Sequence, residues 1–172
     1  MRIVAGRWRG HTIKAPADDR VRPTADRVRE AWMSIVHPQL PGARVVDLFA
    51  GSGALGLEAL SRGASHCDFV ELATRSRAAL RANIDKLGAG DVAHIVRADA
   101  LKFVERLEPD AYDIAFADPP YGLQLAARVA ERWLAVPFAV LLGIEHGVKE
   151  QMPDGGDTRK YGDTAITFYH AR

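Results

Sequence analysis

The chain has only one cysteine, Cys67, among its 172 residues, which excludes an internal disulfide framework. No apolar run approaches the roughly 20 residues that a membrane span needs, and residues 1–6 lack the apolar core of a signal peptide. The cysteine and the six scattered histidines show no metal-ligand spacing, so we expect no metal. These absences indicate a soluble, cytoplasmic protein that does not meet a membrane.

Net charge is also small, since the chain carries a formal charge of only +1. The charged residues are unevenly placed, however, because residues 1–30 hold eight basic side chains against four acidic ones. Such asymmetry favours an N-terminal surface that meets an anionic partner, with nucleic acid as the first candidate. The alternative is a solvated segment whose arginines meet no partner.

The length fits one compact unit, in which residues 1–42 form an N-terminal extension and residues 43–172 the main domain. Two short apolar runs flank Gly6-Arg7-Trp8-Arg9-Gly10, a pattern typical of a small β-hairpin. The tip of this hairpin would offer two arginines to phosphates and Trp8 to a base. Alternatively, Trp8 packs on the main domain.

A helix is predicted to follow the hairpin, with Thr24 as its N-cap and its end near Val36. The residues that recur at helical spacing and predict its buried face are Val28, Ala31, Trp32 and Ile35. The charged residues that lie off this face are Arg27, Arg29 and Glu30.

From residue 43 onward, short apolar runs alternate with helical patterns, which is typical of a parallel sheet covered by helices. Strands are expected at 44–49, 67–72, 92–97, 112–117 and 138–145. Helices are expected at 54–62, 74–87, 99–107 and 123–134, the second and third of them capped by Thr74 and Asp99. A closing hairpin is expected to join 159–161 to 164–169. The pattern predicts an α/β fold.

A glycine-rich loop follows the first expected strand and opens a helix, with the spacing G-x-G-x-x-G at Gly51, Gly53 and Gly56. Glu71 lies twenty residues past Gly51, at the end of the second expected strand. A carboxylate there can accept hydrogen bonds from two ribose hydroxyls. These features predict a cofactor that contains a nucleoside, and by themselves they are also compatible with a nicotinamide dinucleotide.

Asp47 favours another cofactor, because an acid at the end of the first strand can meet a positively charged amino group. A dinucleotide has no such group there, whereas S-adenosylmethionine has its methionine amine. Asp99 follows the third strand and could accept from the adenine amine, or it could serve only as an N-cap. The order of acids therefore favours S-adenosylmethionine.

The four residues Asp118-Pro119-Pro120-Tyr121 directly follow the fourth expected strand. Prolines donate no backbone hydrogen bond and fix their own φ, so they form a rigid platform whose carbonyls point in a set direction. Asp118 adds a carboxylate and Tyr121 an aromatic face, which together suit a flat ring that bears an amine. The alternative is a proline turn that only ends a strand.

These stretches resemble class I S-adenosylmethionine-dependent methyltransferases, and within them the bacterial small-subunit (16S) ribosomal RNA guanine-N2 methyltransferases of the RsmD type. The resemblance covers nearly the whole chain. Besides the glycine loop and the Asp-Pro-Pro-Tyr turn, the stretches that carry it are Arg2-Ile3-Val4-Ala5-Gly6 with Arg9-Gly10, residues 22–30, residues 57–64 and Tyr161-Gly162-Asp163-Thr164. The chain departs from the family pattern at Ala25 and at Trp32-Met33-Ser34.

The resemblance implies a seven-stranded Rossmann-like sheet whose last strand is antiparallel. It implies that Asp118 and the Pro119 carbonyl hold the guanine amine while Tyr121 stacks on the base. The residues expected to bind the cofactor are Asp47, Ala50, Gly51, Gly53, Glu71, Leu72, Asp99 and Ala100. The residues expected to bind nucleic acid are Arg7, Trp8, Arg9, Arg20, Arg22, Thr24 and Arg27.

The expected reaction transfers the methyl group of S-adenosylmethionine to the N2 amine of a guanine in small-subunit ribosomal RNA, which leaves S-adenosylhomocysteine. The expected partner is this RNA within a partly or fully assembled subunit, and we expect a monomeric enzyme. Adenine-N6 and glutamine-N5 methyltransferases share the turn, but the N-terminal stretch argues against them. An NAD(P)-dependent oxidoreductase shares the glycine loop. A non-catalytic RNA-binding protein would not require Asp118 and Tyr121.

Overall fold

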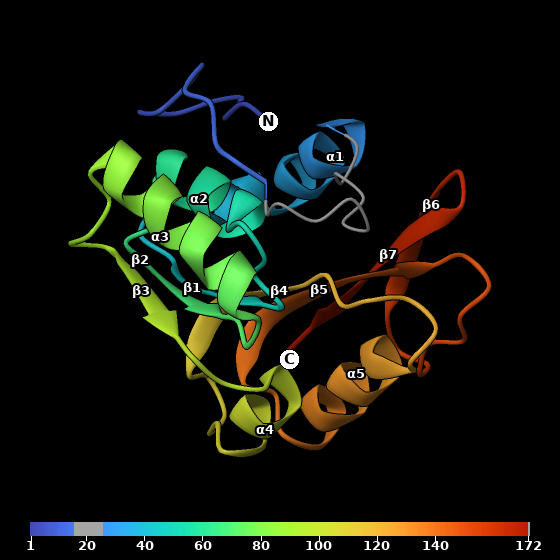
Figure 1. Cartoon of the computed structure of the whole chain (residues 1–172). Helices are drawn as coiled ribbons and strands as arrows, with labels where there is room; N and C mark the ends of the chain where they lie inside the picture. The colour runs from blue at the N-terminus through green and yellow to red at the C-terminus, as the bar shows by residue number, and fades with distance from the viewer. Residues whose placement is uncertain (16–25, 172) are drawn as a thin grey trace.

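The computed structural model describes residues 1–15 and 26–171, and its centre is one seven-stranded sheet. The strands are β1 (Arg44–Leu48), β2 (His66–Val70), β3 (Ala93–Val96), β4 (Tyr112–Ala117), β5 (Ala139–Gly147), β6 (Asp157–Tyr161) and β7 (Thr164–His170). Their order across the sheet is β3-β2-β1-β4-β5-β7-β6, and β7 runs antiparallel to both of its neighbours. The expected seven-stranded sheet with an antiparallel last strand is confirmed (Figure 1).

The helices are α1 (Asp26–Val36), α2 (Ala54–Ser61), α3 (Thr74–Leu87), α4 (Ala100–Glu105) and α5 (Leu125–Ala135), with a short 3-10 helix η1 (His37–Gln39) after α1. One face of the sheet is covered by α1, α2 and α3, and the other by α4 and α5 (Figure 1). Because both faces are covered, β1 and β4 are buried along almost their whole length. No helix in the described part of the chain is long and apolar enough to cross a membrane.

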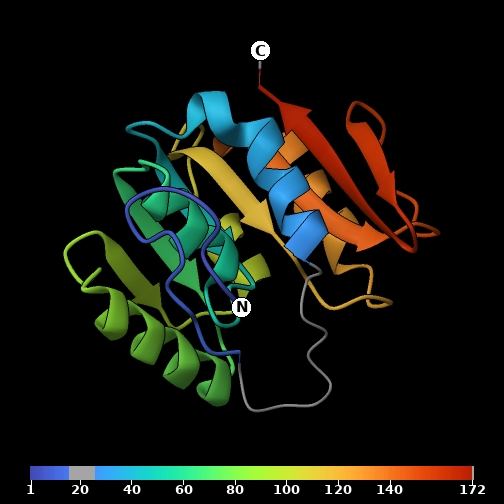
Figure 2. The ribbon, with the colours of Figure 1, turned by 90° about the horizontal axis from the view of Figure 1, so that it is seen from above.

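Helix α1 packs against β4, β5 and β7, and its buried face differs from the prediction. Figure 2 shows α1 lying across this half of the sheet. The indole of Trp32 meets Phe116 and Phe168 edge-on, at ring centroid distances of 5.4 and 5.7 Å. Trp32 and Met33, which depart from the family pattern, are therefore core residues. The prediction that Arg29 lies off the buried face is wrong, because its side chain is only 2% exposed.

The N-terminal arm, residues 1–15, folds back on itself as the hairpin pattern predicts. Ile3 N donates to the His11 carbonyl at 3.0 Å, and Arg2 and Thr12 form an isolated antiparallel bridge. Trp8 is only 9% exposed and belongs to the core beneath the arm. The alternative in which Trp8 packs on the main domain is thus the observed one.

Two of the three predicted helix caps, Thr74 and Asp99, lie within the described residues, and they have different outcomes. Asp99 caps α4, because its carboxylate accepts from Lys102 N at 3.1 Å. Thr74 is not a cap: the N-cap of α3 is Ala73, and no side chain accepts a hydrogen bond there. The third predicted cap, Thr24, lies outside the described residues, as do Arg20 and Arg22.

Candidate active site

Three acidic side chains converge at the carboxyl ends of the central strands. Leu48 at the end of β1 is paired with Val70 of β2 and with Ala117 of β4. Glu71 and Asp118 follow these two partners in sequence, so both lie beside the end of β1. This is also where the strand order reverses, since β2 lies on one side of β1 and β4 on the other. Ligands of open α/β sheets bind at such a position.

Asp47 lies inside the end of β1 and is almost completely buried. Its Oδ2 atom accepts a hydrogen bond from Gly56 N, in the first turn of α2, at 3.0 Å. Burial raises the pKa of the Asp47 carboxyl well above its ordinary value, the Gly56 N–H lowers it, and the negative charges of Asp118 and Glu71 raise it further. A bound cation at this point would therefore stabilise the ionised carboxylate.

The glycine loop combines an open backbone with a tightly packed helix. Phe49 has a φ of 57° and Gly51 a φ of 58°, which is the left-handed region. An added Cβ at Gly51 would meet nothing within 4 Å, so the loop presents open backbone there. At Gly56 an added Cβ would lie 2.4 Å from a ring carbon of Phe69, because α2 packs closely on β2. Gly51 thus leaves room for a ligand, whereas Gly56 allows the helix to approach the sheet.

Glu71 is held by two backbone donors, one from each side. Its Oε1 atom accepts from Gly51 N at 2.8 Å and its Oε2 atom from Ala73 N at 2.9 Å. Each oxygen keeps a second lone pair that can accept from a hydroxyl. Leu72, the next residue, is 55% exposed although it is apolar, so it offers a surface to a flat ring.

The Asp-Pro-Pro-Tyr turn is tied to two distant segments. The Tyr121 hydroxyl lies 2.9 Å from Thr164 Oγ1, at the start of β7. Glu150 accepts from Gly122 N at 3.1 Å with one oxygen and from Gly147 N at 2.7 Å with the other. The turn is therefore fixed to the end of β5 and the start of β7. Thr164 belongs to a stretch that carries the resemblance, but the sequence gives no signal for Glu150.

A second buried acid, Glu58 on α2, joins the N-terminal arm to the domain. It is 1% exposed and accepts from Val4 N at 2.9 Å and from Ala5 N at 3.2 Å. Arg62 Nε donates to it at 3.0 Å, and Arg29 Nε lies 3.8 Å away. This arrangement explains why Arg29 is buried, since its charge faces a carboxylate. The arm and the domain therefore pack as one unit.

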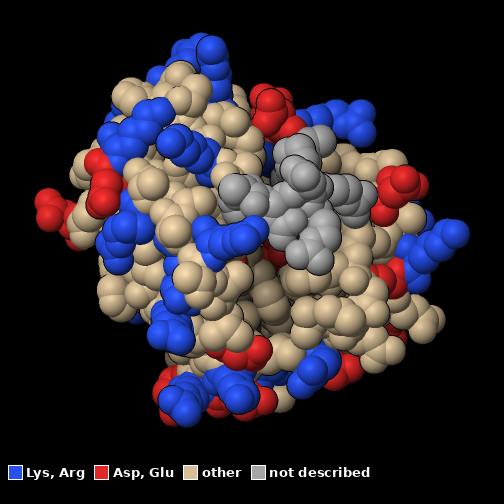
Figure 3. All heavy atoms as spheres, in the orientation of Figure 1, with Lys and Arg blue, Asp and Glu red and all other residues tan. Residues whose placement is uncertain are grey.

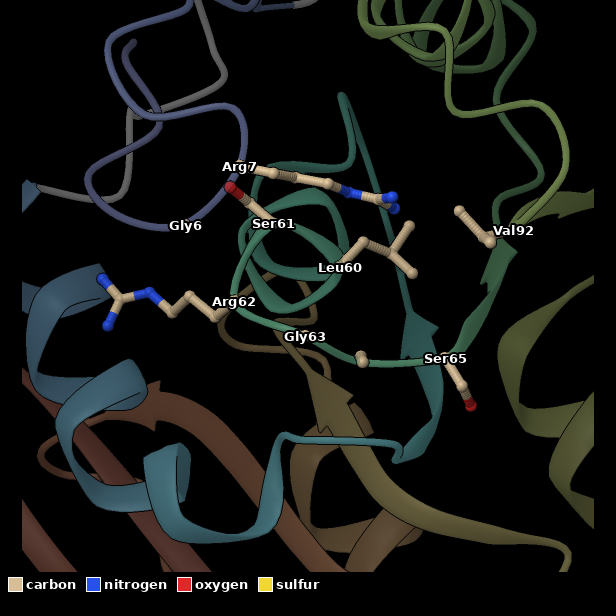
Figure 4. Close-up of a pocket in the computed structure, with 9 residues that line it drawn as sticks. Gly6, Arg7, Leu60, Ser61, Arg62, Gly63, Ser65 and Val92 are labelled. Atoms are coloured by element: carbon tan, nitrogen blue, oxygen red, sulfur yellow. The ribbon is translucent and has the colours of Figure 1, made fainter.

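Among the residues expected to bind nucleic acid, those that the structure describes differ in exposure. Arg7, Arg9 and Arg27 are exposed, whereas Trp8 is buried with the Arg7 guanidinium 4.2 Å from the centroid of its ring. In Figure 4 the Arg7 side chain extends past Leu60 toward Val92.

Arg7 lines an open hollow of about 540 Å³ between the arm and the end of α2. The residues around it are Gly6, Arg7, Leu60, Ser61, Arg62, Gly63, Ala64, Ser65 and Val92 (Figure 4). Ser65 and Val92 immediately precede β2 and β3, so this hollow lies at the amino ends of the strands. It is separate from the acidic site at their carboxyl ends.

Comparison with known proteins identifies close relatives over the whole length. The profile of a family described as Conserved hypothetical protein 95 matches residues 1–170. The Ribosomal RNA small subunit methyltransferase D of Escherichia coli K12 is 40% identical over 158 residues, which cover 89% of this chain and 78% of that protein. The protein of the same name in Haemophilus influenzae is 35% identical over 176 residues, covering 98% and 91%.

Among solved structures, a hypothetical protein of Thermus thermophilus has a TM-score of 0.84 at 32% identity, and 99% of each chain is covered. The sheet order and the structural neighbours are those of class I methyltransferases.

Proposed function

Since the chain belongs to the Conserved hypothetical protein 95 family, and ribosomal RNA small subunit methyltransferases D are among its relatives, we propose that it methylates a guanine of small-subunit ribosomal RNA at N2. The protein is a ribosomal RNA methyltransferase of the class I fold. S-adenosylmethionine is the methyl donor in this proposal. The names of the relatives do not favour the adenine-N6, glutamine-N5 or oxidoreductase alternatives.

The observation that carries the proposal is the juxtaposition of a cofactor-type glycine loop with the Asp-Pro-Pro-Tyr turn at the point where the strand order reverses. Leu48 of β1 is paired with Ala117, so Asp118 follows directly beside the loop that begins at Phe49. A methyl donor held by the loop would therefore lie next to an amine held by the turn.

The residues of the loop fit S-adenosylmethionine in their chemistry. Asp47 is a buried acid whose carboxylate would gain from a nearby ammonium group. Glu71 keeps free lone pairs for ribose hydroxyls, and the exposed Leu72 offers an apolar surface to adenine. Asp99 and Ala100 follow β3 at the same edge, and we assign them to the adenine as well. When bound, the cofactor supplies an electrophilic methyl group on a sulfonium.

Asp118 and the Pro119 carbonyl, in this mechanism, accept the two hydrogens of the guanine amine. The lone pair of this amine is conjugated with the ring, so the nitrogen must become pyramidal before it attacks. Acceptors that face its hydrogens favour that geometry and stabilise the positive charge that develops on nitrogen. No strong base is needed beforehand, because the methylated amine then loses a proton readily to water. Tyr121 stacks on the base, with its hydroxyl anchored by Thr164.

The substrate in this proposal is an unpaired or flipped guanine, because the amine must reach the turn from outside a base stack. Residues 1–42 act as the RNA-binding extension and residues 43–172 as the methyltransferase domain. Arg7, Arg9 and Arg27 are exposed and available to phosphates. We propose that the enzyme acts as a monomer in the cytoplasm on ribosomal RNA within a partly or fully assembled subunit.

The test incubates the whole protein with methyl-labelled S-adenosylmethionine and either protein-free small-subunit ribosomal RNA or partly assembled subunits. We expect label at a guanine N2 and its loss in Asp118→Ala, in which binding of S-adenosylmethionine persists. Removal of one such preorganised acceptor costs about 3 kcal/mol of barrier. In Glu71→Ala, by contrast, cofactor affinity should fall first.

A matched control is Asp157→Ala, which removes an exposed acid from β6. It should leave both cofactor binding and methyl transfer unchanged. The proposal is wrong if the protein retains a dinucleotide instead of S-adenosylmethionine, or if no RNA guanine acquires label. The assignment of roles is wrong if Asp118→Ala loses the cofactor while Glu71→Ala binds it normally.

A further inference from the structure

Helix α3 carries a second set of basic residues that the charge asymmetry of the N-terminal thirty residues does not include. Residues 1–15 contain Arg2, Arg7, Arg9 and Lys14 and no acidic residue. Helix α3 contains Arg75, Arg77, Arg81 and Lys86 against the single acid Asp85. These two segments are about sixty residues apart in the chain, so the sequence alone does not show that they lie side by side in the fold.

The fold places the arm directly along α3. Lys86 Nζ donates to the carbonyl of Thr12 at 2.7 Å and contacts its hydroxyl at 2.6 Å. The buried amide of Asn83 accepts from Lys14 N at 2.8 Å and donates to the Lys14 carbonyl at 2.9 Å. The arm is therefore held in a fixed position against the helix.

The same asparagine connects α3 to the cofactor loop, because its Nδ2 atom also donates to the Ser52 carbonyl at 3.0 Å. Helix α3 begins at Thr74, three residues after Glu71. The helix therefore leads from the arm to the rim of the candidate active site. A nucleic acid strand on this surface could reach the site without leaving the protein.

The basic side chains of this surface are open to solvent. Arg9, Lys14, Arg75 and Arg81 are exposed. Figure 3 shows Lys and Arg side chains gathered over the part of the molecule where Figure 1 places the arm and α3. Like charges held together on a rigid surface repel one another, and phosphates relieve this repulsion. Binding of such a surface to nucleic acid releases condensed counterions, so it weakens with salt.

We infer that the arm and α3 together form one phosphate-binding surface, and that Arg75 and Arg81 bind the RNA backbone on the way to the methylated base. This inference rests on the proposed function, because it takes RNA as the partner. It adds a region of contact that lies outside the N-terminal extension. Its role is to hold the strand, so it affects RNA affinity and not the chemistry of methyl transfer.

The experiment measures binding of the whole protein to protein-free small-subunit ribosomal RNA at several salt concentrations. In Arg75→Ala with Arg81→Ala we expect the slope of log K against log salt to decrease by about 0.7 to 0.9 for each lost phosphate contact. The KM for RNA should rise, while kcat and the affinity for S-adenosylmethionine stay unchanged. The matched control is Arg106→Ala with Arg128→Ala. These exposed arginines lie at the C-terminal end of α4 and in α5, on the face of the sheet opposite to α3.

The inference is confirmed if only the α3 pair changes the slope and the KM. It is overturned if the α3 pair leaves both unchanged, or if the control pair changes them equally, since net charge alone would then be responsible. These outcomes differ from a failure of the proposed function, in which the unsubstituted protein itself transfers no methyl group to RNA.

Discussion

The hydroxyl of Tyr121 and the hydroxyl of Thr164 lie 2.9 Å apart, although 43 residues separate them in the chain. Tyr121 ends the Asp-Pro-Pro-Tyr turn, and Thr164 begins β7, the antiparallel strand next to β5. The hydrogen bond sets the direction of the Tyr121 ring relative to the sheet. An aromatic ring that must receive a base gains from such an anchor, because the ring is already placed before the base arrives.

Loss of this anchor should impair methyl transfer. Tyr121→Phe keeps the ring but removes its hydroxyl, and Thr164→Val removes the partner. A single hydrogen bond of this kind contributes about 1 kcal/mol, so we expect each change to lower kcat/KM for RNA about fivefold. The double substitution should cost no more than either alone, because both remove the same interaction. Steady-state methylation of ribosomal RNA provides the measurement.

Thr158→Val is the matched control for that series, since Thr158 bonds to Thr167 within the same hairpin, at 2.8 Å. It should leave kcat/KM for RNA unchanged. If the losses in the double substitution were additive, Tyr121 and Thr164 would act separately, and their hydrogen bond would not be what positions the ring.

Glu150 should act as a positioning residue for the turn. Its carboxylate accepts from Gly122 N and from Gly147 N, so it bridges the residue after Tyr121 and the end of β5. We expect Glu150→Ala to lower kcat about tenfold with little change in S-adenosylmethionine affinity, because two charge-assisted hydrogen bonds are lost. Glu150→Gln keeps one amide oxygen and should retain part of the activity. Equal activity of all three proteins would contradict this role.

The Asp47 carboxylate should lower the stability of the protein without ligand and strengthen its binding of the cofactor. An asparagine at this position can still accept from Gly56 N, but it buries no charge. We therefore expect Asp47→Asn to raise the free energy of unfolding of the protein without ligand. Its affinity for S-adenosylmethionine should fall at least about tenfold, since a hydrogen bond to a charged partner contributes about 1.5 to 3 kcal/mol. Urea unfolding and calorimetric titration measure the two effects, and lower stability in this variant would contradict the argument.

The pH dependence of stability provides an independent check on Asp47. Its carboxyl pKa in the folded protein lies well above 3.8, its ordinary value, chiefly because of burial. The folded state thus keeps the proton to higher pH than the unfolded state does. Stability from this group is present below the unfolded pKa and is lost as pH rises through the folded pKa. In Asp47→Asn the free energy of unfolding should no longer fall over this pH range. An unchanged pH profile would contradict the raised pKa of Asp47.

Glu58 should be essential to the position of the arm. Glu58→Ala leaves Val4 N and Ala5 N, which are partly buried, without their acceptor. It also removes the buried carboxylate that faces Arg29, which is then paired with the exposed Asp26. Removal of one member of a buried ion pair costs about 3 to 5 kcal/mol, and we expect a loss of this size in urea unfolding. Glu58→Gln should lose less. The exposed Glu105 serves as the control position, where alanine should change stability by no more than about 0.5 kcal/mol.

The sequence alone predicted the elements of the sheet and the residues at its carboxyl edge. Strand β4 was predicted at its observed bounds, because a buried parallel strand is a largely apolar run, in which Asp113 is the one charged residue here. Asp47, Glu71 and Asp118 could be placed together because parallel strands end at one edge, whatever the rest of the fold does. The roles of the individual site residues stay predictions.

Only the tertiary structure decided which side chains support the site and the arm. Helical spacing placed Arg29 on the exposed side of α1, but its side chain is buried with its Nε atom 3.8 Å from the Glu58 carboxylate of α2, which offsets its charge. Trp8 lies between two arginines in a segment that the sequence predicts to be an exposed hairpin tip, yet the domain beneath covers its side chain. The contacts of Glu150 and of Lys86 cross 28 and 74 residues of chain. Contacts of this length leave no period in the sequence, since they arise when separately formed elements pack together.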